Sequence, residues 1–445
     1  MRLTVPEPKI DLYNEGFEKH CRLGRAKDGQ KLSDLVERVS EPMVVALDAP
    51  WGAGKSVFLK CWVGAHVAEN GGTATTVYFD AFKHDYLDDP LVSIVGVVAE
   101  RLESLGGSKS GSAKKKGLAK VKSYAPMFGR ALLRLGIAYA TAGALHEIPD
   151  PTQSLADDAL DAGSKELGDA TRDFWRTEEN RRNAMEGFRE GLSQVASDET
   201  KLVIVVDELD RCRPDYALSL LEVIKHFFDV PNVHFILGVN SAELANSVRA
   251  RYGSGVQAEK YLQKFITLTM PLVPRPARRG PSTQLQIDHF RYVSEQLGLE
   301  ASWKFRWLET YLGYVDHHAG LGLRDVERIA ALAVLTPEPI ERPEARLHLY
   351  TGLIILKVHA PGLIQKAKDG SLNNEDVFRI FKLRGQAEIG GARWKAHACW
   401  VLATLPDGQI PESVLDEWKI ILFLDYEPSE LLRDTLADCI EAFQI

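Results

Sequence analysis

The amino-acid sequence predicts an α/β protein built on a parallel sheet, followed by a domain made of helices. Two observations lead to this expectation. Five short apolar segments rich in β-branched residues are linked by stretches with apolar residues at helical spacing, which is typical of strands joined by helices. From about residue 285 onward, helical patterns follow one another with breaks that contain Pro or Gly.

The composition is that of an ordinary globular protein. The 445 residues are 45% hydrophobic and 26% charged, and the net charge of −8 argues against a surface that binds nucleic acid all round, although a local basic patch stays compatible. The five cysteines are scattered without a C-x-x-C pair, which excludes a disulfide framework or a cysteine-rich zinc site and favours a reducing cytoplasm. The N-terminal stretch lacks the apolar core of a signal peptide.

The first strand is expected at 42–48, and it runs into "ALDAPWGAGKSVFLK" (46–60), a Gly-rich turn before a helical stretch at 56–69. Strand, tight turn and helix form the context that a phosphate-binding loop needs. The usual pattern G-x-x-x-x-G-K-[ST] lacks its first glycine because Ala49 stands there, so an ordinary turn stays equally compatible with this motif alone. As a phosphate loop, it would bind the nucleotide through Trp51, Gly52, Ala53, Gly54, Lys55, Ser56 and Val57.

A second motif lies in "KLVIVVDELDRCRPD" (201–215), where an apolar strand ends in Asp207 and Glu208. Asp207 would hold Mg²⁺ through water, and Glu208 would orient and deprotonate an attacking water. The alternative is a buried strand that runs into an acidic turn, which is common in α/β proteins. Because "GAGKS" supplies the phosphate contacts that the acids lack, the two motifs together predict a nucleotide site with Lys55 on the β- and γ-phosphates and Ser56 on Mg²⁺.

Three further strands are expected at 73–80, 233–240 and 264–274. The second of the five ends at Asp80. The fourth ends at Asn240, which would contact the γ-phosphate or the attacking water, or else serve as a helix N-cap or turn residue. The domains expected are an N-terminal segment at 1–41 with a helix at 29–40, a nucleotide core at 42–280 and a helical domain at 281–445.

An insert at about 103–180 interrupts the core. Its segment 107–122, Gly/Ser-rich with six lysines and no acids, predicts a flexible connection or a solvated basic loop. In the stretch 124–151 the longest charge-free apolar run, Leu135 to Leu145, has 11 residues, whereas a spanning helix needs about 20. We therefore expect a buried or partner-binding helix first and an interfacial membrane helix second. No transmembrane span is expected.

The stretches "WGAGKS", "VYFDAFKHD", "VIVVDELDRCRPD" and "FILGVN", in this order, resemble the KAP family of P-loop NTPases, and "DELDRCRP" is the most specific of them. The resemblance covers roughly residues 10 to 380. It implies an ATPase with ATP and Mg²⁺ as cofactors and a P-loop NTPase core of sheet order 5-1-4-3-2 with helices on both faces. Many relatives insert transmembrane helices between the two nucleotide motifs, a point on which this insert departs from the family. Several bacterial relatives are associated with phage exclusion or defence, which implies such a role by analogy only.

The resemblance also implies roles for the individual residues that match the family's motifs. Arg211 lies in "DELDRCRP", the stretch most specific for the family. It is expected either to act as an arginine finger or to form a salt bridge with Asp210 or Asp215. The remaining assignments are Lys55 and Ser56 for phosphate and Mg²⁺, Asp207 and Glu208 for the metal and catalytic acids, Asn240 for a sensor and Arg324 for a second sensor in the helical region.

The interpretation that follows is a Mg²⁺-dependent ATPase that acts as a nucleotide-driven switch or assembly factor on a protein partner. A non-hydrolysing ATP-binding scaffold is the alternative, and Glu208 argues against it because a pure binder would not need an acid beside the metal ligand. A nucleic-acid-stimulated ATPase that uses the lysines of 107–122, with weak binding, is a third reading, and self-association stays open. A GTPase is disfavoured because no N-K-x-D motif follows the fourth strand.

Asp316, His317 and His318 are expected to have a surface or packing role, because adjacent residues splay apart on a helix.

Overall fold

The computed structural model describes most of the chain, in two compact units. One unit contains Lys9–Pro50 and Lys55–Leu272, and the other contains Trp51–Gly54 and the described part of Val273–Ile445. The described residues are 8–20, 23–87, 89–105, 178–196, 201–227, 229–272, 284–316, 320–339, 343–383, 391–404, 416, 418, 420 and 428–441.

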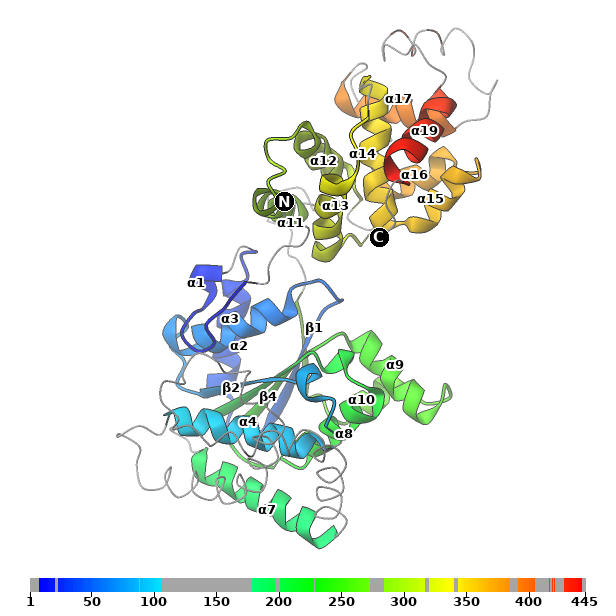
Figure 1. The fold of residues 1–445 in the computed structure, drawn as a ribbon. Coiled ribbons are helices and arrows are strands. Elements are labelled where there is room, and N and C mark those ends of the chain that lie inside the picture. Colours follow the sequence, from blue (N-terminus) through cyan, green and yellow to red (C-terminus); the bar gives the residue numbers. More distant parts are fainter. Residues whose placement is uncertain are drawn as a thin grey trace, which may run out of the picture. The chain divides into compact units, whose positions relative to one another are not determined.

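A five-stranded parallel sheet forms the centre of the first unit (Figure 1). Its order is β2-β3-β4-β1-β5, which is the predicted order 5-1-4-3-2 followed from the opposite edge. The predicted α/β class and strand order are therefore confirmed. The strands are β1 (Met43–Asp48), β2 (Thr75–Asp80), β3 (Leu202–Asp207), β4 (Val233–Val239) and β5 (Leu268–Pro271).

The fifth strand is shorter than the apolar run 264–274 suggests. Helix α10 (Ala258–Leu262) precedes it, and the N–H groups of Phe265 and Ile266 both donate to the carbonyl of Leu262, at 2.9 and 3.1 Å. These amides are used in a helical turn and cannot join the ladder with β1. The first backbone hydrogen bond to β1 accordingly comes from Thr267, whose N–H donates to the carbonyl of Val44 at 2.9 Å, and the paired register begins at Leu268.

Helices cover both faces of the sheet. On one face α3 (Lys55–Ala68) contacts β2, β3 and β4. Two helices from the N-terminal segment, α1 (Phe17–His20) and α2 (Ala26–Arg38), pack onto α3. The predicted helix at 29–40 corresponds to α2.

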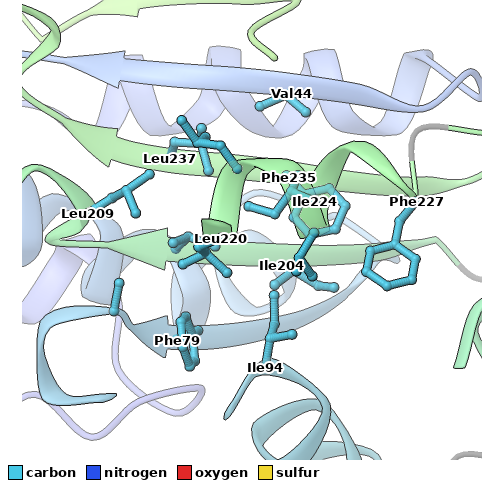
Figure 2. Packing of buried hydrophobic residues seen from close by; sticks show 14 of the residues in the cluster. Val44, Phe79, Ile94, Ile204, Leu209, Leu220, Ile224, Phe227, Phe235 and Leu237 are labelled. Carbon is cyan, nitrogen blue, oxygen red and sulfur yellow. The ribbon is translucent and has the colours of Figure 1, made fainter. Parts of the chain in front are cut away.

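The opposite face carries the main hydrophobic core (Figure 2). Alternate residues of β1 to β4 point into it, whereas the residues between them face α3, so these strands are buried on both faces and mostly apolar. Figure 2 shows Phe79, Ile204 and Phe235 from three strands, together with Ile94 and Leu220 from helices. The helices that supply this core are α4 (Pro90–Leu105), α7 (Glu178–Val195), α8 (Pro214–Lys225), α9 (Ser241–Tyr252) and α10.

In the second unit, the described residues after Gln284 form a helical bundle around a core that includes Phe290, Tyr311, Phe381 and Trp400. Helix α13 (Leu323–Leu335) carries Arg324 in its first turn. A single antiparallel bridge joins Val315 to Phe381. The other helices are α11 (Gln284–Leu297), α12 (Trp303–Tyr314), α14 (Glu344–His359), α15 (Pro361–Lys368), α16 (Asn374–Ile380), α17 (Ala392–Thr404) and α19 (Pro428–Thr435), with a π-helical turn at Leu436–Ile440.

Several expectations fall on parts of the chain that are not described. These are the basic segment 107–122, the apolar stretch 124–151 and the pair His317 and His318. Among the helices that are described, none has both the length and the apolar character needed to cross a bilayer.

Candidate functional site

The loop between β1 and α3 has the backbone of a phosphate-binding turn. Gly52 and Gly54 have φ values of 81° and 79°, in the left-handed region where a side chain is disfavoured. Helix α3 begins directly after them at Lys55, so its N-terminal amides lie at the end of the loop. An anion placed there would meet the N-terminal N–H groups of α3 and the positive end of the helix dipole.

The Lys55 side chain folds back over this loop. Its Nζ donates to the carbonyl of Ala49 at 2.6 Å and to that of Pro50 at 3.4 Å. Only 8% of Lys55 is exposed. Burial lowers the pKa of the Lys55 ammonium, and the nearby Asp210 and Asp207 oppose that shift. Within the described residues, the lysine is thus a largely dehydrated cation hydrogen-bonded to two neutral carbonyls, which phosphate oxygens would replace favourably.

The acids predicted from the second motif lie at the carboxyl end of β3. Asp207 is its last residue and is buried. Its Oδ2 accepts a hydrogen bond from the Tyr78 hydroxyl at 2.7 Å, and its Oδ1 accepts one from the Glu208 N–H at 2.9 Å. Burial raises the pKa of Asp207, while the hydrogen bond from Tyr78 and the nearby Ser56 hydroxyl favour the ionised form.

Glu208 joins the two motifs. The Ser56 hydroxyl donates to its Oε1 at 3.3 Å, although the two residues are 152 positions apart. Burial raises the pKa of Glu208, and Arg211 opposes this. Backbone angles of φ 58° and ψ 26° place Glu208 in the left-handed region, which turns the chain sharply away from the strand. Ser56, Asp207 and Glu208 therefore meet at one edge of the sheet, and their roles toward phosphate, Mg²⁺ and water stay a prediction.

Arg211 has a partner that the sequence did not indicate. It lies in a short 3₁₀ helix (Leu209–Arg211), and its Nη1 is 3.1 Å from Oε1 and 3.2 Å from Oε2 of Glu208. A salt bridge was expected with Asp210 or Asp215, but the ion pair that Arg211 forms here is with Glu208. The left-handed turn at Glu208 explains this, because it brings the next turn back over the glutamate side chain. A role as a finger stays a prediction.

The donor set fits Mg²⁺. Ser56 offers a hydroxyl oxygen and Asp207 a buried carboxylate, both of the hard oxygen type that this ion prefers. In the described part of the chain, no cluster of three or more His, Cys, Asp or Glu side chains could hold a metal by itself. Mg²⁺ usually binds one or two carboxylates and completes its shell with water and substrate phosphates, so a sparse donor set is what its site requires.

Asn240 stands at the start of α9, but another side chain caps that helix. Asn240 is the N-cap residue of α9, but its side chain makes no capping hydrogen bond. Instead Asp48, at the end of β1, accepts from the N–H of Ser241 at 2.8 Å. The side chain of Asn240 is therefore not committed to the helix end, and its sensor role stays a prediction. The same holds for Arg324, whose place on α13 belongs to the other unit.

Sequence reasoning also missed two residues that pack on Asp207. One is Tyr78 on β2, and the other is Gly238 on β4, where an added Cβ would lie 2.6 Å from Oδ1 of Asp207 and 2.5 Å from Cδ1 of Leu59. The available signal for Gly238 was a glycine inside an apolar strand, which often marks a close approach. Tyr78 gave no signal beyond a hydroxyl within the run "TVYFD".

Comparison with known proteins supports the phosphate-loop assignment. A model of the KAP family P-loop domain matches residues 26–336, which include both nucleotide motifs. Among solved structures, the chain is similar to the ORC2 protein of Aeropyrum pernix in its ADPNP-ADP complexes, with 12% identity, a TM-score of 0.36 and coverage of 96% of this chain and 95% of that one. It is also similar to Drosophila ORC bound to DNA, with 13% identity, a TM-score of 0.33 and coverage of 95% and 86%. No curated protein matches. The structural likenesses are loose, and the family assignment depends on the family model alone.

Proposed function

The chain belongs to the KAP family of P-loop NTPases, and on that premise we propose that it is a Mg²⁺-dependent ATPase acting as a nucleotide-driven switch or assembly factor. The observation that carries the proposal is the 3.3 Å hydrogen bond from Ser56 to Glu208, because it joins the phosphate loop to the acidic end of β3. A glutamate beside the metal-binding hydroxyl is what hydrolysis needs and what simple binding does not.

Each side chain has its own task in this proposal. Lys55 exchanges the carbonyls of Ala49 and Pro50 for β- and γ-phosphate oxygens. Ser56 and Asp207 hold Mg²⁺, which when bound supplies positive charge beside the transferred phosphoryl group. Glu208 orients a water and accepts its proton. The backbone of Trp51, Gly52, Ala53, Gly54 and Val57 lines the phosphates, and Asn240 and Arg324 sense the γ-phosphate.

A protein partner is proposed because the sequence carries no second catalytic motif of the G-x-S-x-G or H-E-x-x-H type. Self-association, and weak nucleic-acid binding through the lysines of 107–122, are the alternatives to it. Among the described residues, Cys61, Cys212, Cys399 and Cys439 form no disulfide, which suits a reducing cytoplasm. Bacterial anti-phage defence is the biological role that we propose by analogy with relatives.

The test compares Lys55→Ala with Glu208→Gln. Loss of Lys55 removes a phosphate contact in both ground and transition states, so ATP binding and hydrolysis should both fall. Glu208→Gln keeps size and most hydrogen bonding, so affinity should be retained while the rate falls about 10²–10⁴-fold, the usual cost of losing a general base. Calorimetry with MgATP and a phosphate-release assay measure the two quantities, and Lys31→Ala, an exposed lysine on α2, is the control.

Size-exclusion chromatography with ATP tests the switch. The glutamine variant should accumulate in the ATP-bound assembly, whereas the Lys55→Ala variant should not form it. Hydrolysis at the wild-type rate by Glu208→Gln would refute the assignment of the base, and Asp80, whose register partner is Asp207, would become the candidate. A wild-type protein that binds ATP but releases no phosphate would favour the scaffold.

A further inference from the structure

Tyr78 reaches the metal-binding acid because of the register between two strands. β2 pairs with β3 so that Tyr78 lies opposite Val205, and Asp207 follows two residues later on the same face. Residues two positions apart along a strand point to the same face of the sheet, so Tyr78 and Asp207 share the face that carries α3. The Tyr78 hydroxyl accordingly donates to Oδ2 of Asp207 at 2.7 Å, and both side chains are buried.

On the other neighbouring strand, Gly238 provides the space that the Asp207 carboxylate occupies. In the ladder between β3 and β4, Val206 lies opposite Leu237, which places Gly238 beside Asp207. Any side chain at 238 would occupy the space of the carboxylate, since even a Cβ would come within 2.6 Å of Oδ1. Two hydrogen bonds therefore hold the Asp207 carboxylate, one from the Tyr78 hydroxyl and one from the Glu208 N–H at 2.9 Å. The carboxylate has room there only because residue 238 carries no side chain.

Tyr78 is itself held in place by a neighbour remote from the acids. Its N–H donates to the hydroxyl of Tyr13 at 3.2 Å, and the Tyr13 ring lies 3.5 Å from the guanidinium carbon of Arg101. These contacts fix the backbone of Tyr78 without touching Asp207. They also provide a matched control, because Tyr13→Phe removes one hydrogen bond to the same residue and leaves the acid alone.

We propose that Tyr78 is a positioning residue for Asp207, which sets the direction in which the carboxylate presents its oxygens to Mg²⁺ and the waters around it. The inference deepens the proposed function and depends on it. A hydrogen-bond partner behind a metal-binding carboxylate keeps that group in its binding orientation, and removing such a partner commonly costs 10- to 100-fold in metal affinity. The hydroxyl of Tyr78 acts on the metal only through Asp207.

The experiment measures Mn²⁺ binding to the full chain with ADP, followed by the loss of the free Mn²⁺ signal in electron paramagnetic resonance. In Tyr78→Phe, the Mn²⁺ affinity of the ADP complex should fall about 10-fold, at the lower end of that range. ADP binding measured with EDTA should match the wild type, and Tyr13→Phe should match the wild type in both assays. Gly238→Ala, which displaces the carboxylate from the opposite side, should weaken Mn²⁺ binding as well.

The outcomes distinguish a failure of this inference from a failure of the proposed function on which it depends. If the wild type binds neither ADP nor Mn²⁺–ADP, the proposed function fails and the inference fails with it. If the wild type binds both and Tyr78→Phe binds Mn²⁺ equally well, only the inference is overturned. Equal losses in Tyr78→Phe and Tyr13→Phe would also overturn it, since they would show a general disturbance of β2. Should Tyr78→Phe not fold, unchanged Mn²⁺ affinity in Gly238→Ala would count against it in the same way.

Discussion

The guanidinium of Arg211 is paired with the carboxylate of Glu208, with Nη1 at 3.1 Å from Oε1 and 3.2 Å from Oε2. The same Oε1 accepts the Ser56 hydroxyl. Both oxygens of the proposed base are therefore engaged before any water is activated.

Arg211→Ala should move the pH dependence of hydrolysis. Arg211 lowers the pKa of Glu208 against the effect of burial, so its removal raises that pKa. The base works only when ionised, and the rate falls as the pH drops through its pKa. The acidic limb of the pH–rate profile should therefore shift to higher pH, with the plateau retained.

Arg249→Ala, which removes an ion pair with Glu259 on α9 and α10, is the control for this experiment and should leave the limb in place. A plateau that drops by 10³-fold or more without a shift of the limb would instead identify Arg211 as a transition-state finger.

Gly238→Ala should destabilise the protein. The added Cβ would lie 2.5 Å from Leu59 and 2.6 Å from Asp207, so the core must shift, and overpacking of this kind costs about 1–3 kcal/mol. Gly255→Ala is the matched control, since a Cβ there meets nothing within 4 Å, and it should change stability by less than about 0.5 kcal/mol. Urea unfolding followed by tryptophan fluorescence gives both values. Equal midpoints for the two variants would show that β4 accommodates the methyl group.

His234 should make the first unit sensitive to acid. Burial on β4, helped by Lys201, lowers the pKa of His234 to about 4, below the value of about 6.5 expected in the unfolded chain. Between these values the unfolded state binds one more proton, so stability rises with pH across the window and is lost as the pH falls from 6.5 to 4. In His234→Leu the drop in the urea midpoint between pH 7 and pH 5 should be smaller. His226→Leu, at an exposed position after α8, should keep the wild-type drop, and an identical drop in both variants would contradict the assignment.

The site residues that could be predicted from the sequence are those whose position follows from one segment alone. Lys55 and Ser56 come directly after β1, and Asp207 and Glu208 end or follow β3. Parallel strands bring their carboxyl ends to the same edge, so identifying two strands was enough to bring these side chains together.

The contacts that were not predicted depend on pairing and backbone conformation. Tyr78 meets Asp207 only because β2 lies beside β3 in one particular register, and the periodicity of each strand contains no information on its neighbour. Arg211 pairs with Glu208 because the backbone of Glu208 itself is left-handed, which the spacing of residues alone does not reveal.

The left-handed backbone at Glu208 has opposite consequences for the stability of the fold and for the proposed hydrolysis. A non-glycine residue in this conformation costs roughly 1–2 kcal/mol, and glycine or asparagine adopts it more easily. Selection for stability alone would therefore replace the glutamate with one of these, whereas selection for hydrolysis would retain it. At position 208, the residue that would make the fold most stable and the residue that the proposed hydrolysis needs are therefore not the same.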